Sequence, residues 1–172
     1  RPAFVQADCN DAAAMAQVFD MYDDIQGVIH FAASKAVNES VLQPLMYYRN
    51  NLMSLVTLLE QMKAHSIHHI VFSSSCTVYG QPSAEHLPVD ETAPIQVALS
   101  PYGNTKQINE EIIRDEAHAN AALHATILRY FNPIGAHPSA MIGELPNGVP
   151  NNLLPFVTQT AAGLRQQLRV YG

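Results

Sequence analysis

The sequence predicts an α/β protein built on a parallel sheet, because short apolar segments alternate with longer segments of helical periodicity. The clearest apolar segments are residues 27–31, 69–72 and 125–130, and small residues or serines follow the first two. The chain has 172 residues, of which 48% are hydrophobic. That composition can fill the core of one domain.

The first half of the chain is expected to begin with a short strand at residues 4–6. Asn10 is then placed to cap a helix that runs to about Met21. After the strand at 27–31, a long helix is expected from near Pro44 to about Lys63, because leucines recur there near helical spacing.

The second half starts with a loop at residues 80–99, rich in proline and acidic residues, as is typical of active-site loops. Ser100 and Pro101 predict the N-cap and first turn of a helix that continues to about His118. Residues 132–150 are too long for a plain connector, which favours a segment that wraps a ligand. Residues 151–163 are expected to be helical, with Pro155 implying a late start or a kink.

Both termini are expected to be cuts through a larger protein. The chain opens at Arg1 without an initiator methionine, and residues 168–172 stop on a strand pattern.

Charge and cysteine content exclude several classes of function. The formal net charge is -6 with only 9 Lys+Arg, which argues against binding to duplex nucleic acid. No apolar run approaches the length of a membrane span. Cys9 and Cys76 stand far apart, which favours a reducing compartment and therefore the cytoplasm. His65 and His69 have helical spacing, but His69 opens a strand, so no metal site is predicted.

The sharpest chemical feature is Tyr102 followed four residues later by Lys106, a spacing that puts both side chains on one helix face. A phenol with a pKa near 10 is a poor base at neutral pH, and a neighbouring cation favours the phenolate. The phenolate could then take a proton from a hydroxyl of the substrate. The pattern alone is common by chance. In most proteins that contain it, the tyrosine simply packs as an aromatic side chain beside a solvated lysine.

Ser75 strengthens the catalytic interpretation. It ends the run 73–75 directly after an apolar strand, where α/β sheets place groups that contact ligands. A hydroxyl at a strand end, followed by tyrosine and lysine one helical turn apart, is the constellation of the short-chain dehydrogenase/reductases.

Longer motifs narrow this resemblance. HFAASKAVNES at 30–40, FSSSCTVYG at 72–80, SPYGNTK at 100–106, LRYFNPIGAHPS at 128–139 and GVPNNLLP at 148–155 resemble the UDP-glucose 4-epimerases. These enzymes are extended short-chain dehydrogenase/reductases, and the resemblance covers essentially the whole chain in order.

The resemblance implies a Rossmann-like, doubly wound parallel sheet that lacks its first strands. Residues 1–131 would be a partial NAD-binding domain, and 132–172 would begin a small substrate-binding domain. The glycine-rich pyrophosphate loop of the family would precede Arg1, and arginines that hold the sugar diphosphate would follow Gly172. The fragment alone is therefore expected to bind NAD poorly and to be inactive.

The implied reaction is epimerisation at C4 of a UDP-hexose, by transient hydride transfer to tightly bound NAD, in a protein that is a homodimer at full length. Tyr102 would be the catalytic base and Lys106 its cationic neighbour, while Ser75 would bind the C4 oxygen, with Thr77 as a second candidate. The implied cofactor contacts are Asp8, Cys9, Phe31, Ala32, Ala33, Ser34, Lys35, Asn50, Tyr102, Lys106 and Phe131. The implied substrate contacts are Ser75, Asn132, Asn152, Leu153, Arg169, Val170 and Tyr171.

Two positions depart from the family pattern, and three rival functions stay open. Cys76 stands where the family usually has a small alanine, and Arg169 where it tends to be small and apolar. A nucleotide-sugar 4,6-dehydratase would need an acidic pair beside Ser75, which Cys76 and Thr77 do not offer. A binding module that lost its chemistry is the second rival. The third is a Ser/Lys hydrolase, although the G-x-S-x-G elbow of many hydrolases is missing.

Overall fold

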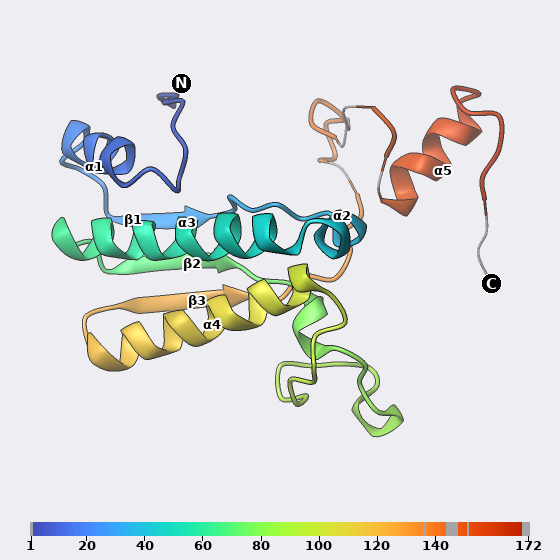
Figure 1. The fold of residues 1–172 in the computed structure, drawn as a ribbon. Coiled ribbons are helices and arrows are strands. Elements are labelled where there is room, and N and C mark those ends of the chain that lie inside the picture. Colours follow the sequence, from blue (N-terminus) through green and yellow to red (C-terminus); the bar gives the residue numbers. More distant parts are fainter. Residues whose placement is uncertain (1, 136, 144–147, 151, 170–172) are drawn as a thin grey trace. The chain divides into compact units, whose positions relative to one another are not determined.

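The computed structural model describes residues 2–135, 137–143, 148–150 and 152–169. The chain divides into two compact units, residues 1–130 and 131–172. The elements of the first unit are α1 (Ala12–Met21), β1 (Gly27–His30), α2 (Val37–Leu42), α3 (Pro44–Ala64), β2 (His69–Ser73), the 3-10 helices η1 (Cys76–Tyr79) and η2 (Ala84–His86), α4 (Pro101–Ala119) and β3 (His124–Leu128) (Figure 1). The second unit contains α5 (Leu153–Ala161).

The three strands form one parallel sheet in the order β1-β2-β3. Ile70 of the central strand is in register with Val28 on one side and with Ala125 on the other. The prediction of a parallel α/β sheet is confirmed. Since the strands are parallel, their carboxyl ends lie along one edge, where ligands of such sheets bind.

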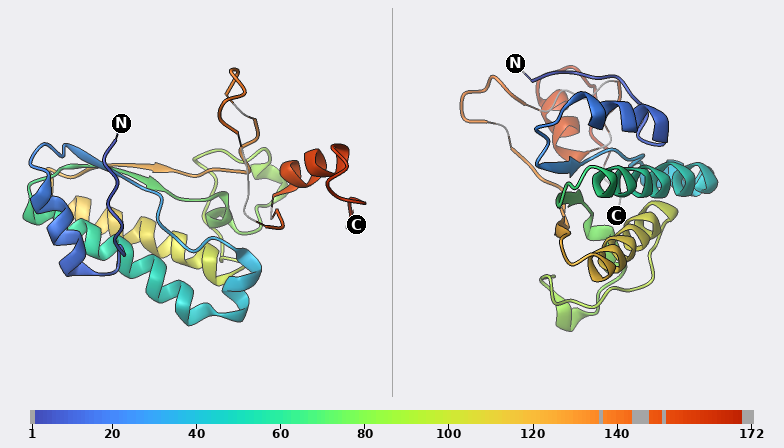
Figure 2. Two further views of the ribbon diagram at one scale, coloured as in Figure 1. Left: turned by 90° about the horizontal axis from the view of Figure 1, so that it is seen from above. Right: turned by 90° about the vertical axis from the view of Figure 1, so that its left-hand side faces the viewer.

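Helices α1, α3 and α4 lie on the same face of this sheet (Figure 2). Their apolar side chains enclose the core with the central strand: Phe19 from α1, Leu55 and Met62 from α3, Ile70 and Phe72 from β2, and Ile113 from α4. Among the described elements of the first unit, no helix covers the opposite face of the sheet (Figure 2), and Ile29 of β1 is 65% exposed.

Two predictions about the first residues are wrong. Residues 4–6 form no strand and Phe4 is exposed, because no strand among the described residues pairs with their backbone. The cap of α1 is Asp11 rather than Asn10, since Asp11 Oδ1 accepts hydrogen bonds from Ala13 N and Ala14 N, each at 3.0 Å.

Other boundaries differ by a few residues. Strand β1 ends at His30 and β3 ends at Leu128, each earlier than predicted. The short α2 and η1 were not predicted. Helix α5 begins at Leu153 rather than at residue 151, so the expected late start is correct. Pro155 is its third residue, where the missing N–H of proline removes no hydrogen bond within the helix. Residues 168 and 169 show no strand, and 170–172 lie outside the described residues. No helix within the described ranges combines the length and apolar character needed to span a bilayer.

Candidate functional site

Ser75 lies just beyond the carboxyl end of β2, and its two neighbours in sequence are held by backbone hydrogen bonds to the last residue of β3 and to the chain that follows it. Ser74 N donates to Leu128 O at 2.9 Å, and Cys76 N donates to Tyr130 O at 2.7 Å. The Ser75 hydroxyl caps η1, accepting from Thr77 N at 3.2 Å and from Thr77 Oγ1 at 2.9 Å. Ser75 is 8% exposed. Its position is therefore fixed by the sheet, as predicted for a strand-end residue.

The first turn of α4 brings Tyr102 to the same place. Ser100 Oγ caps the helix by accepting from Gly103 N at 3.1 Å, which confirms the predicted start. A Cβ on Gly103 would lie 3.4 Å from both Thr77 Cβ and Thr77 O, so α4 is in van der Waals contact with η1 at this glycine. This contact places Tyr102 beside the serine-bearing segment.

Lys106 completes the group. It is 3% exposed, and its Nζ donates to the carbonyl oxygen of Ser73 at 2.6 Å. The same Nζ lies 5.8 Å from the ring centroid of Tyr102 and 4.9 Å from that of Phe72. The structure thus brings Ser75, Tyr102 and Lys106 together at the carboxyl edge of β2.

Burial dominates the proton affinities of this group. Burial raises the pKa of Tyr102, a hydrogen bond with Ser75 lowers it, and Cys76 raises it again, with a net upward direction. Burial lowers the pKa of Lys106 to about 8. In the protein alone burial is thus the largest influence on the Tyr102 pKa, and the expected effect of Lys106 and of a bound cofactor on this phenol stays a prediction. His30, also buried, has its pKa lowered to about 4 by burial and by Lys106.

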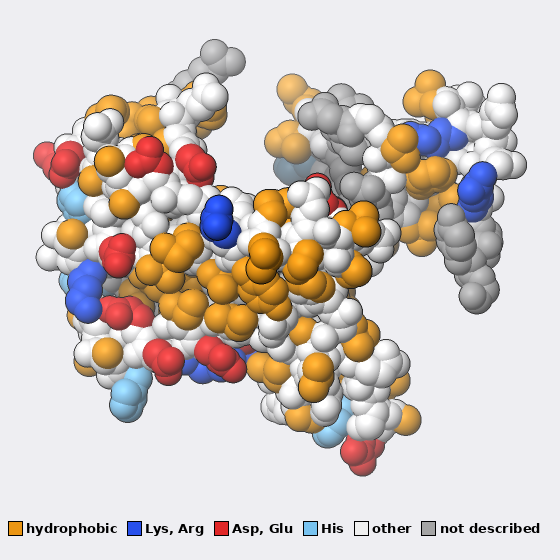
Figure 3. Space-filling view, in the orientation of Figure 1, with side chains coloured by type: hydrophobic (Ala, Val, Ile, Leu, Met, Phe, Trp, Pro, Cys, Tyr) orange, Lys and Arg blue, Asp and Glu red, His pale blue; other side chains and the backbone are white. Residues whose placement is uncertain are grey.

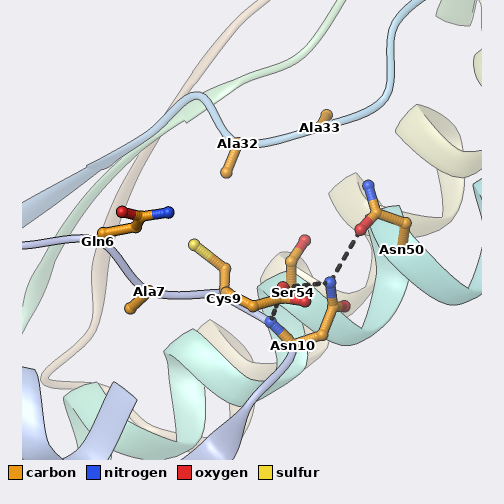
Figure 4. Close-up of a pocket in the computed structure, with 9 residues that line it drawn as sticks. Gln6, Ala7, Cys9, Asn10, Ala32, Ala33, Asn50 and Ser54 are labelled. Carbon is orange, nitrogen blue, oxygen red and sulfur yellow. Dashed lines mark hydrogen bonds between the residues drawn. The ribbon is translucent and has the colours of Figure 1, made fainter. Parts of the chain in front are cut away.

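A cavity of about 710 Å³ opens near the carboxyl end of β1 (Figure 4). Residues of the segment before α1, of the segment after β1 and of α3 line it. Its lining contains the predicted cofactor residues Asp8, Cys9, Ala32, Ala33 and Asn50, together with Gln6, Ala7, Asn10 and Ser54. Sequence reasoning did not find the last four.

Asn10 organises the polar side of this cavity. Its Nδ2 donates to Asp8 Oδ1 at 2.9 Å and to Asn50 Oδ1 at 2.8 Å, and its backbone N also donates to Asp8 Oδ1. These bonds from Asn10 lower the pKa of Asp8, while burial and then Asp8 raise the pKa of Cys9. Asn10 Oδ1 is buried and has no hydrogen-bond partner among the described residues. A buried acceptor of this kind fits a ligand that brings a hydrogen-bond donor.

The segment after β1 is tied to α3. Ser34 N donates to Asn51 Oδ1 at 2.8 Å, and Ser34 Oγ accepts from Asn50 Nδ2 at 3.0 Å. Asn51 also donates to the carbonyl oxygen of Ser34 and to Thr105 Oγ1, which links this segment to α4. Phe31 and Lys35 are exposed and do not line the cavity.

The remaining predicted ligand contacts belong to the second unit. Phe131, Asn132, Asn152, Leu153 and Arg169 are exposed, and Leu153 begins α5. Val170 and Tyr171 lie outside the described residues. The binding roles of these residues stay predictions. Within the described ranges, no group of three or more His, Cys, Asp or Glu side chains could hold a metal ion.

A parallel sheet with serine, tyrosine and lysine gathered at one strand end defines the short-chain dehydrogenase/reductase class. The family model described as GDP-mannose 4,6 dehydratase matches residues 1–172, and the chain belongs to this family.

Individual relatives indicate a narrower group of enzymes within this family. The chain is 51% identical over 169 residues to UDP-glucose 4-epimerase of Mus musculus, a match that covers 98% of this chain and 48% of that protein. It is 49% identical over 172 residues to UDP-glucose 4-epimerase 2 of Arabidopsis thaliana, again over 48% of that protein. The chain spans about half the length of the curated relatives it matches.

Solved structures agree. UDP-glucose 4-epimerase from Bifidobacterium longum, in complex with NAD+ and UDP, has a TM-score of 0.90 and 46% identity over 98% of this chain and 49% of that one. The Stenotrophomonas maltophila enzyme, with NAD and formylated UDP-arabinopyranose, also has a TM-score of 0.90 and 46% identity, over 99% of this chain and 50% of its own. The predicted Rossmann-like sheet and the resemblance to epimerases are confirmed.

Proposed function

We propose that the protein to which this chain belongs is a UDP-glucose 4-epimerase that interconverts UDP-galactose and UDP-glucose. The carrying observation is the convergence of Ser75, Tyr102 and Lys106 at the end of β2. It occurs in a chain 51% identical over 169 residues to an enzyme of that name.

In this proposal Tyr102 accepts the proton of the C4 hydroxyl while the C4–H bond breaks and its electron pair leaves as hydride. Ser75 donates a hydrogen bond to the C4 oxygen and holds it near the phenol. The Ser75 hydroxyl itself accepts a hydrogen bond from Thr77 Oγ1 at 2.9 Å. After the 4-keto sugar has turned, Tyr102 returns the proton to the C4 oxygen as hydride returns to the opposite face of C4. The sugar leaves with inverted C4 and unchanged composition.

NAD, when bound, supplies a reversible hydride acceptor. The cavity residues Asp8, Cys9, Ala32, Ala33 and Asn50 would hold it, and the unpaired Asn10 Oδ1 would accept a hydrogen bond from it. Lys106 would contribute positive charge beside Tyr102, which favours the phenolate against the cost of burial.

A 4,6-dehydratase is the second candidate, because the matching family model carries that description. Water elimination needs a further acid and base next to the sugar. The residues beside Ser75 are Cys76 and Thr77, whose side chains are a thiol and a hydroxyl. This set favours the epimerase.

Two further parts of the proposal concern the whole protein. We expect a homodimer, because helices α2 and α3 expose Val41, Leu42, Leu45 and Met53, and hydrophobic atoms gather over this face (Figure 3). We also expect a cytoplasmic location, since Cys9 and Cys76 are free thiols.

The direct test incubates the full-length protein with UDP-galactose, without added reductant, and separates the products by chromatography. UDP-glucose is the expected product, formed until both sugars reach equilibrium. A product that has lost water would support the dehydratase instead, and the absence of any conversion would contradict both candidates.

A further inference from the structure

Glu110 lies one helical turn beyond Lys106 on α4 and has no role in the proposed chemistry. Its side chain is 0% exposed. One carboxylate oxygen, Oε1, accepts from Ser74 Oγ at 2.6 Å and from Arg129 Nε at 3.0 Å. The other, Oε2, accepts from Arg129 Nη2 at 2.7 Å and from Arg114 Nη2 at 2.9 Å. Each oxygen of this carboxylate therefore accepts two hydrogen bonds.

Two of these partners control the segment that carries Ser75. Ser74 is the residue directly before it. Arg129 Nη1 donates to the hydroxyl of Tyr79 at 3.1 Å, and its guanidinium carbon lies 5.0 Å from the centroid of the Tyr79 ring. Tyr79 is the last residue of η1. Glu110 therefore holds segment 74–79 at its first residue directly and at its last residue through Arg129.

The cost of burial explains why such a cluster points to positioning rather than to stability. A buried carboxylate must recover a desolvation cost of several kcal/mol, and well-packed apolar residues often serve stability as well or better. A bidentate arginine–carboxylate pair instead gives directional bonds of fixed geometry. The pKa of Arg129 is raised by Glu110 first and by Tyr79 as well, so this cation stays charged.

We propose that Glu110 is a positioning residue for the reaction: with Arg129 and Ser74 it holds Ser75 at the distance from Tyr102 at which both can share one substrate oxygen. This inference rests on the proposed epimerase function. Tyr102, Lys106 and Glu110 follow each other at four-residue spacing on α4, so one helix face carries both the base and the clamp for its partner hydroxyl.

The test compares Glu110→Gln with Arg114→Gln in the full-length, NAD-loaded protein. Glutamine keeps the shape of Glu110 but weakens its hold on Arg129 and Ser74. We expect kcat to fall about 10- to 100-fold, as for a small misplacement of a reacting group. KM for UDP-galactose should change less than about threefold, because in the proposal this segment contacts the substrate only at the C4 oxygen, through Ser75. Bound NAD should be unchanged.

Arg114→Gln is the matched control. Arg114 donates to the same carboxylate, but its side chain is 50% exposed. It has no hydrogen bond to segment 74–79 among the described residues, so its loss should not move Ser75. Its kcat should stay within about twofold of the wild type.

Ser74→Ala tests the same bond without changing charge and carries the test if Glu110→Gln does not fold. It should lower kcat without raising KM, and adding Glu110→Gln to it should cost less than the sum of the two single effects. A fall in melting temperature with wild-type kcat in both variants overturns the inference and leaves the epimerase standing. An inactive wild type overturns both.

Discussion

The two ends of the candidate site are built in opposite ways. At the chemical end, Ser75 and Lys106 are buried, and their polar atoms bond to Thr77 and to the Ser73 carbonyl. In the cavity, Asp8 is exposed, and Asn10 Oδ1 has no partner among the described residues. Proton transfer needs groups held in place before substrate arrives. A cofactor site can leave one acceptor for the ligand to satisfy.

The two ends of the site also differ in the secondary structure that carries their residues. The chemical end is carried by β2, η1 and α4, which are regular elements, and η1 packs on α4. Most of the cavity wall comes from irregular backbone before α1 and after β1. Substitutions at the chemical end should therefore change kcat, and those in the cavity should change the affinity for NAD.

The largest expected effect is that of Tyr102→Phe. Removal of the phenol oxygen should lower kcat about 10³-fold, within the range for loss of a general base, while bound NAD stays at the wild-type level. Steady-state epimerisation and the absorbance of released NAD measure the two quantities.

Tyr48→Phe is the control for that variant. Its hydroxyl accepts from Asn104 Nδ2 at 2.7 Å, so it probes loss of a tyrosine oxygen near α4 but outside the Ser75 site. Near-normal turnover in Tyr102→Phe would remove the base from the proposed mechanism.

Ser75→Ala should have a smaller effect, a fall in kcat of about 10- to 100-fold, as for loss of one donor to a reacting oxygen. Thr77 Oγ1 lies 2.9 Å from Ser75 Oγ and can replace it in part. The double variant Ser75→Ala, Thr77→Val should therefore lose more than Ser75→Ala alone. Equal rates of the single and double variants would show that Thr77 gives no such replacement.

The smallest effect is expected in the cavity. Asn10→Ala removes the unpaired acceptor and the donor to Asp8 and Asn50. The apparent Kd for NAD should rise about 5- to 10-fold, the value of one or two hydrogen bonds, while kcat at saturating NAD stays constant. Gln17→Ala, at an exposed position of α1, is the control. A fall in kcat without a change in Kd would contradict the separation of the two ends.

The grouping of Ser75, Tyr102 and Lys106 could be predicted from the sequence because its signals are local. Tyr102 and Lys106 are four residues apart, Ser100 caps the helix beneath them, and Ser75 follows a strand whose apolar composition is plain. Contacts between residues far apart in the sequence could not be predicted from such local patterns. Glu110 bonds to Ser74 across 36 residues, and Asn10 bonds to Asn50 across 40.

The wrong predictions have the same cause. Asn10 and Asp11 are both residue types that cap helices, but only Asp11 lies where its side-chain oxygen reaches Ala13 N and Ala14 N, while the amide of Asn10 donates to Asp8 and to the distant Asn50. Residues 4–6 have strand composition but no neighbouring strand among the described residues. Burial, which is likewise a property of the folded chain, sets the upward direction of the Tyr102 pKa, and the four-residue spacing to Lys106 does not reveal it.

The ionisation of Tyr102 tests the central claim most directly. Tyrosinate absorbance near 295 nm is titrated with pH in the full-length, NAD-loaded protein and in its Tyr102→Phe variant. If this phenol is the base, the difference contains one tyrosine with a pKa below the ordinary value near 10, since positive charge then outweighs the burial that raises the pKa in the protein alone. A difference with no tyrosinate below pH 10 would contradict the assignment.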